Sequence, residues 1–132
     1  MIRVVLVGDD VFARHGISRL LQDAADVRVV GSFDHGTEAV RFLARETVDV
    51  AILDTAMRGG GIDLVRRLRA ISPKTQLLML AKEARPQSVR QAFSAGAAGY
   101  LRKAACGDEV VAAVRAVHSG RRPLAPEKVS EP

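Results

Sequence analysis

The strongest constraint on the fold is an alternation, repeated five times, between short aliphatic runs and longer segments with helical apolar spacing. The first run, 2–7, is almost wholly apolar, as expected of a strand that is buried on both faces. Further strands are predicted over 27–33, 48–54, 75–81 and around 100–101. Helices are predicted over 12–24, from Gly36, from the glycine-rich segment 58–61 to Ile71, from Pro86, and from Asp108 to Gly120. The alternation therefore predicts a βα repeat.

Five βα units predict an α/β fold: a doubly wound parallel sheet with right-handed crossovers and helices on both faces. A chain of 132 residues has room for one domain with its own core. We expect that domain to occupy 1–120, followed over 121–132 by a linker that is rich in proline. Ligands of such sheets bind beyond the carboxyl ends of the strands, so the residues at those ends are the candidates for a site.

The composition excludes several classes of protein. Hydrophobic residues make up 48% and charged residues 27%, which is unlike a disordered chain. The apolar runs are too short to cross a bilayer and the start of the sequence lacks a signal-peptide pattern, so a cytoplasmic protein is expected. The single cysteine, Cys106, cannot form an internal disulfide. The formal net charge is +5, but the basic residues are spread from Arg3 to Lys128, which indicates nucleic-acid binding by this chain only weakly.

Charged side chains follow four of the five predicted strands. Asp9 and Asp10 come after the first strand, Asp54 ends the third, Lys82 follows the fourth and Lys103 follows the last. Because the carboxyl ends of parallel strands meet at one edge of the sheet, these side chains are expected to converge. Carboxylates are ligands for Mg²⁺, and a lysine can pair with a carboxylate or a phosphoryl oxygen. The pattern therefore favours phosphate chemistry at this edge.

The same strand ends resemble the receiver domain of two-component response regulators, most closely the NarL/FixJ type with a LuxR-type output domain. The similarity covers essentially residues 1–126. It is carried by Arg3-Val4-Val5-Leu6-Val7-Gly8-Asp9-Asp10, Arg14, Gly16, Val50-Ala51-Ile52-Leu53-Asp54, Met57, Gly59, Ala95-Gly96-Ala97-Ala98-Gly99-Tyr100-Leu101-Arg102-Lys103, Ala113-Val114-Arg115-Ala116-Val117, Gly120 and Leu124-Ala125-Pro126-Glu127. The resemblance implies a flavodoxin-like (βα)5, CheY-like receiver fold and a regulatory role, not that of an independent enzyme.

The resemblance also implies roles for single residues. Asp54 matches the aspartate that is phosphorylated, Lys103 the lysine that contacts the phosphoryl group, and Tyr100 the aromatic switch position. Mg²⁺ would be held by Asp54 and Asp9. The expected partners are a sensor histidine kinase, a second copy of the chain in a homodimer and, through a helix-turn-helix output domain that nothing in this sequence resembles, promoter DNA. No membrane partner is expected.

The chain departs from the family pattern at four places, one of which is Gly61-Ile62 in place of the usual Asp-Gly. Gly8 stands where the family has the first of two acids, Ala81 replaces the Thr or Ser whose hydroxyl receives a phosphoryl oxygen, and Arg58 replaces a proline. Losing a metal-site contact costs about 10–100-fold in affinity, and a hydrogen bond to a charged oxygen contributes about 1.5–3 kcal/mol. Because the states of a conformational switch differ by only a few kcal/mol, phosphorylation of Asp54 is predicted to shift the conformation weakly.

Other interpretations stay open at this point. Asp10 is a candidate for the missing metal ligand, and Arg58 or Lys82 is a candidate to neutralise Asp54 without metal. The domain could also be an ordinary Mg²⁺-dependent receiver. A third interpretation is a module that senses a small ligand in a pocket widened by the two lost side chains. Such a module would be stabilised by a metabolite and would be indifferent to phosphodonors.

Overall fold

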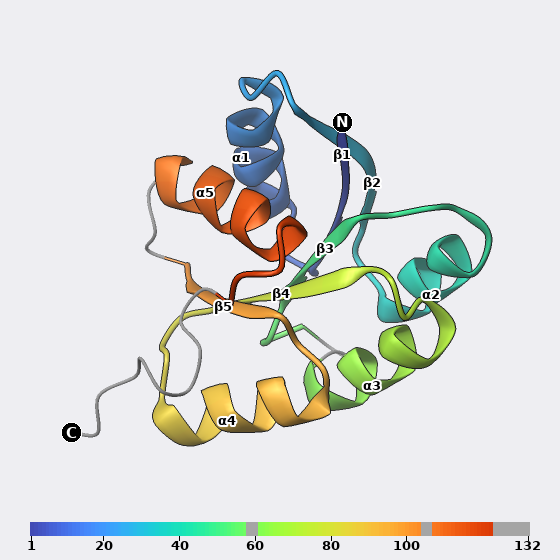
Figure 1. Cartoon of the computed structure of the whole chain (residues 1–132), viewed down its shortest axis with the longest axis vertical. Helices are drawn as coiled ribbons and strands as arrows, with labels where there is room; N and C mark the ends of the chain where they lie inside the picture. The colour runs from blue at the N-terminus through green and yellow to red at the C-terminus, as the bar shows by residue number, and fades with distance from the viewer. Residues whose placement is uncertain (58–60, 104–106, 123–132) are drawn as a thin grey trace.

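The structure is a computed structural model that describes residues 1–57, 61–103 and 107–122 (Figure 1). Within these residues the chain alternates five strands with five helices in the order β1 (Ile2–Val7), α1 (Val11–Gln22), β2 (Val27–Phe33), α2 (Gly36–Arg45), β3 (Val50–Asp54), α3 (Gly61–Ile71), β4 (Gln76–Ala81), α4 (Pro86–Ala95), β5 (Gly99–Arg102) and α5 (Gly107–His118). The strands form one parallel sheet in the order β2-β1-β3-β4-β5. This is the flavodoxin-like doubly wound topology, so the predicted fold class is confirmed.

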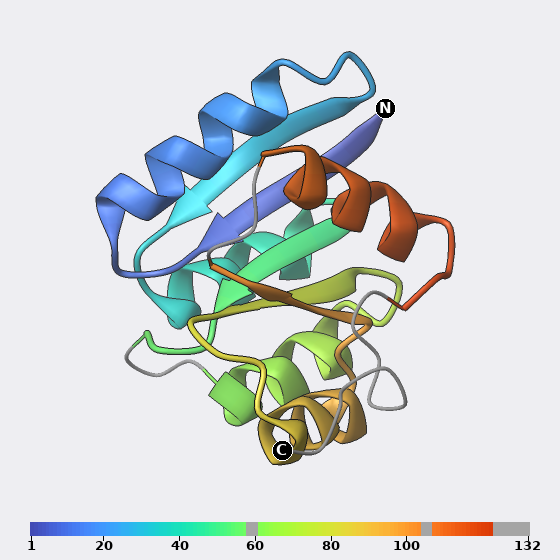
Figure 2. The same ribbon diagram turned by 90° about the vertical axis from the view of Figure 1, so that its left-hand side faces the viewer.

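The helices cover both faces of the sheet. Figures 1 and 2 show α1 and α5 on one face and α2, α3 and α4 on the other. Each face has its own buried apolar cluster, one built around Leu64 and Leu68 of α3 and the other around Val114 and Val117 of α5. Because both faces are covered, the central strands are buried on both sides, and every residue of β3 is buried.

Local signals explain where several helices begin and end. Asp10 caps α1, since its Oδ1 accepts hydrogen bonds from the N–H groups of Phe12 at 3.0 Å and Ala13 at 3.1 Å. Pro86 opens α4, where a missing N–H costs nothing. Gly96 ends α4 with a φ of 122°, a conformation that favours glycine.

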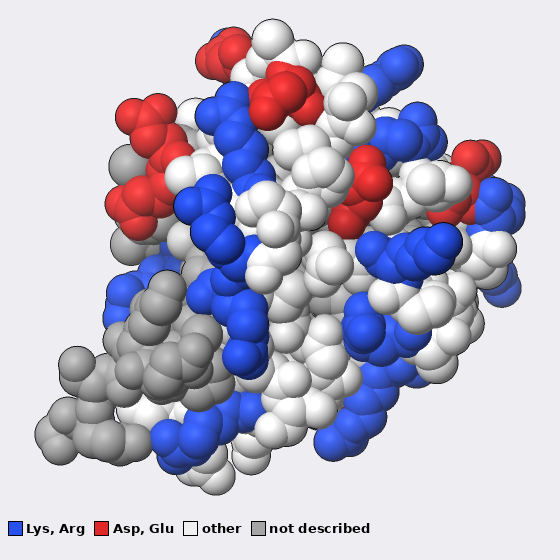
Figure 3. All heavy atoms as spheres, viewed as in Figure 1, with Lys and Arg blue, Asp and Glu red and all other residues white. Residues whose placement is uncertain are grey.

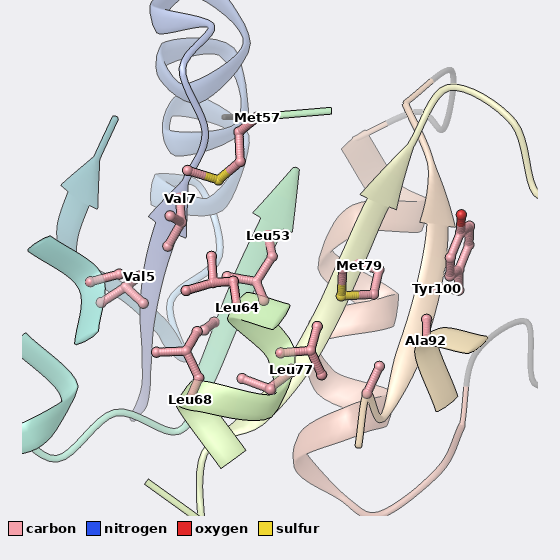
Figure 4. Packing of buried hydrophobic residues seen from close by; sticks show 14 of the residues in the cluster. Val5, Val7, Leu53, Met57, Leu64, Leu68, Leu77, Met79, Ala92 and Tyr100 are labelled. Carbon is pink, nitrogen blue, oxygen red and sulfur yellow. The ribbon is translucent and has the colours of Figure 1, made fainter. Parts of the chain in front are cut away.

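The cluster beneath α3 and α4 reaches the carboxyl end of the sheet. Figure 4 shows Met79 and Tyr100 on neighbouring strands with Ala92 of α4 against them. Tyr100 is buried, with 3% of its surface exposed. The core thus extends directly under the edge where the candidate site lies.

None of the helices in the described ranges is long and apolar enough to cross a membrane. The predicted linker over 121–132 is described only at Arg121 and Arg122, and its remainder lies outside the described residues. The boundary at residue 120 stays a prediction.

Candidate functional site

Asp54 lies at the centre of the carboxyl edge of the sheet. It is the last residue of β3, and only 6% of its surface is exposed. Oδ1 accepts a hydrogen bond from the N–H of Ala56 at 2.9 Å, and Oδ2 lies 2.8 Å from Nζ of Lys103. A nearly buried carboxylate is thus held by one backbone donor and one ammonium group, as a buried charge requires.

Lys103 reaches Asp54 because β5 pairs with β4. The backbone N–H of Lys103 donates to the carbonyl of Ala81 at 2.7 Å, directly after the paired residues Ala81 and Arg102. The ammonium group is partly exposed, with 32% of the side chain accessible. The structure thus brings Asp54 and Lys103 together, as predicted. Because the lysine is partly exposed, it can also pair with an anionic group attached to Asp54.

Gly8 follows β1 and lies against Asp54. A Cβ built at this position would be 3.0 Å from Cβ and 3.6 Å from Oδ2 of Asp54. The space beside both residues is small, about 20 Å³. The lost acid has therefore not opened a sizeable pocket here, because the end of β1 lies so close to Asp54 that even a Cβ at position 8 would be in tight contact with it.

The remaining acids after β1 do not complete a metal site. Asp10 uses one carboxylate oxygen to cap α1, and Asp9 is exposed in the same loop. Across the described residues, no three His, Cys, Asp or Glu side chains gather closely enough to hold a metal ion. One Asp54 oxygen is also occupied by Lys103. These residues do not fit a magnesium site built on three carboxylates, and a helix cap is the role that the structure gives Asp10.

Ala81 borders a separate and much larger groove. The groove has a volume of about 560 Å³ and runs between the start of α3 and α4, lined among others by Thr55, Ala81, Lys82, Ser88 and Tyr100. The predicted single pocket, widened at both substituted positions, is thus wrong: the space beside Ala81 is large, and that beside the glycine after β1 is not. The difference arises because the glycine after β1 lies directly against Asp54, whereas Ala81 borders the space between α3 and α4.

Tyr100 is directed towards the same groove from β5. Its hydroxyl donates to the backbone carbonyl of Glu83 at 3.5 Å, and burial raises the pKa of the phenol above its usual value. Figure 4 shows the hydroxyl directed towards the carboxyl ends of the strands. The ring is therefore tied to the loop between β4 and α4, just after Ala81, the position that lacks the expected hydroxyl.

Other predicted contributors are placed less centrally. Lys82 is exposed and lines the groove. Arg58 lies outside the described residues. Sequence reasoning missed the N–H of Ala56, which is a backbone group without a sequence signature. It also missed Thr55, whose position next to Asp54 was the available signal and whose N–H donates to the carbonyl of Leu80 at 3.0 Å.

Comparison with known proteins gives one consistent result. The family model described as "Response regulator receiver domain" matches residues 4–115. The chain is 38% identical over 126 residues to the response regulator UvrY of Escherichia coli K12, an alignment that covers 95% of this chain and 58% of UvrY. The chain thus spans less than two thirds of the length of this curated relative.

Solved structures give the same result. The receiver domain of the putative response regulator NarL from Mycobacterium tuberculosis has a TM-score of 0.86 and 35% identity, covering 91% of this chain and 98% of that one. A LuxR-family two-component response regulator from Aurantimonas sp. SI85-9A1 has a TM-score of 0.87 and 31% identity, covering 96% and 91%. With the Asp54–Lys103 pair at the expected strand ends, this chain belongs to the receiver domains of two-component response regulators, among relatives of the NarL/LuxR type.

Proposed function

We propose that this chain is the receiver of a transcription-controlling response regulator in which phosphorylation of Asp54 shifts the conformation only weakly. The observation that carries the proposal is the end of β4, where Ala81 offers no hydroxyl beside the groove that Tyr100 borders. Asp54 is the proposed phosphoacceptor and Lys103 the proposed contact of the phosphoryl group. Output would then depend on dimerisation or on another input.

Whether phosphorylation shifts the conformation depends on which side chains can move to contact the added phosphoryl group. Lys103 already lies 2.8 Å from Asp54 Oδ2, so it can pair with a phosphoryl oxygen without rearrangement of β5. If Lys103 makes this contact equally well in both conformations, the contact does not drive a switch, since only a difference in free energy between the conformations shifts their populations. Position 81 itself cannot draw the loop after β4 towards a phosphoryl group, because the methyl group of Ala81 has no hydrogen-bond donor.

Partners of the whole protein are proposed from the relatives. UvrY is named a response regulator, and the Mycobacterium tuberculosis relative a probable transcriptional regulatory protein. Because the chain spans 58% and 60% of these proteins, promoter binding is proposed for a further domain and not for this one. A sensor histidine kinase and a second copy of the chain are the other proposed partners.

The proposal is tested with a small-molecule phosphodonor and Mg²⁺. Wild type and Asp54→Asn are incubated side by side, intact mass reports the adduct, and size exclusion reports the oligomer. We expect a slow adduct, or none, on wild type and no change of oligomer. A fast, Asp54-dependent adduct that changes the oligomeric state would overturn the proposal in favour of an ordinary receiver.

Ala81→Thr is the matched variant, because it returns the hydroxyl at a position that borders open space. If the lost hydroxyl limits switching, phosphodonor should change the oligomer or the Tyr100 environment in Ala81→Thr and not in wild type. An equal response of both proteins would show that position 81 does not set the coupling.

A ligand-sensing receiver is the second candidate, and the groove beside Ala81 favours it. Its volume of about 560 Å³ falls within the range of small-molecule sites. Such a domain would be stabilised by a small molecule equally in wild type and Asp54→Asn. Ala81→Leu, which places a larger side chain in the groove, should abolish that stabilisation.

A further inference from the structure

A basic pocket lies at the edge of the sheet opposite Asp54. It has a volume of about 260 Å³, and its lining includes Gln76 at the start of β4, Arg69 of α3, and Arg121 and Arg122 after α5. In Figure 2 the red segment after α5 descends from the helix towards the strands. Arginines from two distant parts of the sequence thus line one cavity.

The arginines are held by neutral groups. Nη1 of Arg69 donates to the carbonyl of Pro73 at 2.7 Å, and Cζ of Arg122 lies 4.6 Å from the centroid of the Phe93 ring. Nε of Arg121 donates to the hydroxyl of Ser119 at 3.4 Å. Within the described ranges, no carboxylate pairs with these three arginines and none of the residues that line the pocket is acidic.

Capping of helix ends does not explain why three arginines line this pocket. The N–H groups of Gly96 and Ala97 donate to carbonyls in the last turn of α4, and those of Gly120 and Arg121 do so for α5. The two helix ends together contribute a charge of only about −1. The three guanidinium groups therefore leave a net positive charge around the cavity.

The lower part of the face seen in Figure 3 has the same sign, although α3 also carries exposed Asp63, which is paired with Arg66. Figure 3 shows acidic side chains in the upper half of the visible face, whereas the charged side chains visible in its lower half are basic. In this view α3 and α4 form the lower part of the molecule. An anion approaching this part of the chain meets a positive potential, which raises its local concentration.

We propose that this pocket binds a phosphate group, free or carried on a small molecule. A phosphomonoester has a charge of about −1.5 to −2 and three acceptor oxygens, which suits three guanidinium groups. Stacking of Arg122 and anchoring of Arg69 keep these side chains in place before binding, so little freedom is lost when the ligand arrives. Because Arg121 and Arg122 follow α5, the bound ligand ties the segment leaving α5 to α3.

Amide chemical shifts test this directly in the ¹⁵N-labelled chain. Inorganic phosphate, glycerol 3-phosphate and glycerol are titrated at constant ionic strength. We expect saturable shifts for both phosphates at Gly96, Ala97, Ala98 and Gly120, persisting in Asp54→Asn, and none for glycerol. Equal affinities indicate free phosphate as the ligand, and tighter binding of glycerol 3-phosphate indicates a phosphomonoester; both support the site.

Matched charge variants provide the control. Arg121→Gln/Arg122→Gln should weaken phosphate binding by at least about tenfold, the loss expected for charge-assisted hydrogen bonds. Arg41→Gln/Arg67→Gln removes the same charge from exposed positions that do not line the pocket, and should leave the affinity unchanged. Shifts that spread over the surface without saturating, or equal weakening in both variants, would overturn the proposal.

Discussion

The ion pair of Lys103 and Asp54 holds a nearly buried negative charge at the carboxyl edge of the sheet. The Asp54 side chain is 8% exposed, so loss of the ammonium group leaves a charge with little solvent around it. We expect Lys103→Met to lower the free energy of unfolding by about 1–3 kcal/mol in urea denaturation at neutral pH. Adding Asp54→Asn should recover part of that loss. A double variant no more stable than Lys103→Met would show that the unpaired charge is not the cause.

The closeness of Gly8 to Asp54 gives a second prediction for single residues. Gly8→Ala introduces a Cβ at 3.0 Å from that of Asp54 and is expected to cost about 1–3 kcal/mol by overpacking. Gly8→Asp adds like charge to the same crowding, so it should be less stable than Gly8→Ala at neutral pH. Repulsion raises a carboxyl pKa in the folded state, so this difference should shrink as the pH is lowered. Urea titrations of both variants at two pH values measure it, and a difference independent of pH would contradict the charge argument.

How far the sequence predicts the site differs from residue to residue. Asp54 and Lys103 are predictable, because strand ends in a parallel sheet must meet at one edge. The consequences of Gly8 and Ala81 are not, although both are lost side chains. They depend on how closely a strand end or a helix packs against its neighbours, and these distances cannot be predicted from the residue types alone.

At the scale of elements, α1 depends on its cap. Asp10 Oδ1 accepts two backbone N–H groups, and no acidic residue in the first turn of the helix assists it. Asp10→Ala should therefore reduce stability by about 0.5–2 kcal/mol, whereas Asp10→Asn keeps the acceptor and should stay close to wild type. Thermal unfolding followed by circular dichroism distinguishes the two. Equal losses in both variants would mean that the negative charge, and not the cap, is what matters.

Most elements were predicted to within a few residues. The strand over 27–33 is found with those bounds, whereas the first helix ends at Gln22 instead of Ala24. Aliphatic runs identify strands well because burial on both faces leaves little freedom of composition. Helix ends are harder to place, since the last turn depends on backbone hydrogen bonds such as that from the N–H of Ala24 to the carbonyl of Leu21.

At the scale of the whole molecule, an ion pair ties α5 to the segment between α1 and β2, which lies 89 residues earlier in the chain. Arg115 contacts both carboxylate oxygens of Asp26, at 2.8 and 2.9 Å, just before β2. These hydrogen bonds hold the pKa of Asp26 below its usual value of 3.8. A lowered pKa in the folded state means that the stabilisation is complete above that usual value and is lost as the pH falls through the lower, folded one.

We therefore expect Arg115→Gln to lower the urea midpoint at neutral pH and low salt and to have no effect well below pH 3.8. Because both side chains are about half exposed, 1 M salt should also reduce the difference. Arg19→Gln, at an exposed position of α1, removes an equal charge for comparison. A midpoint difference that is the same at all pH values would point to lost packing of the arginine stem.

The strand order has a consequence for how the protein is made. β1 lies between β2 and β3, and β4 and β5 then join the free edge one after another. Each strand after the first can thus pair as soon as it emerges from the ribosome, without waiting for a later partner. The face covered by α5 is different, since Val110, Val114 and Val117 close it last. Until they emerge, the face that α1 and α5 share is covered by α1 alone, and the apolar surface left open there is one that a chaperone can bind.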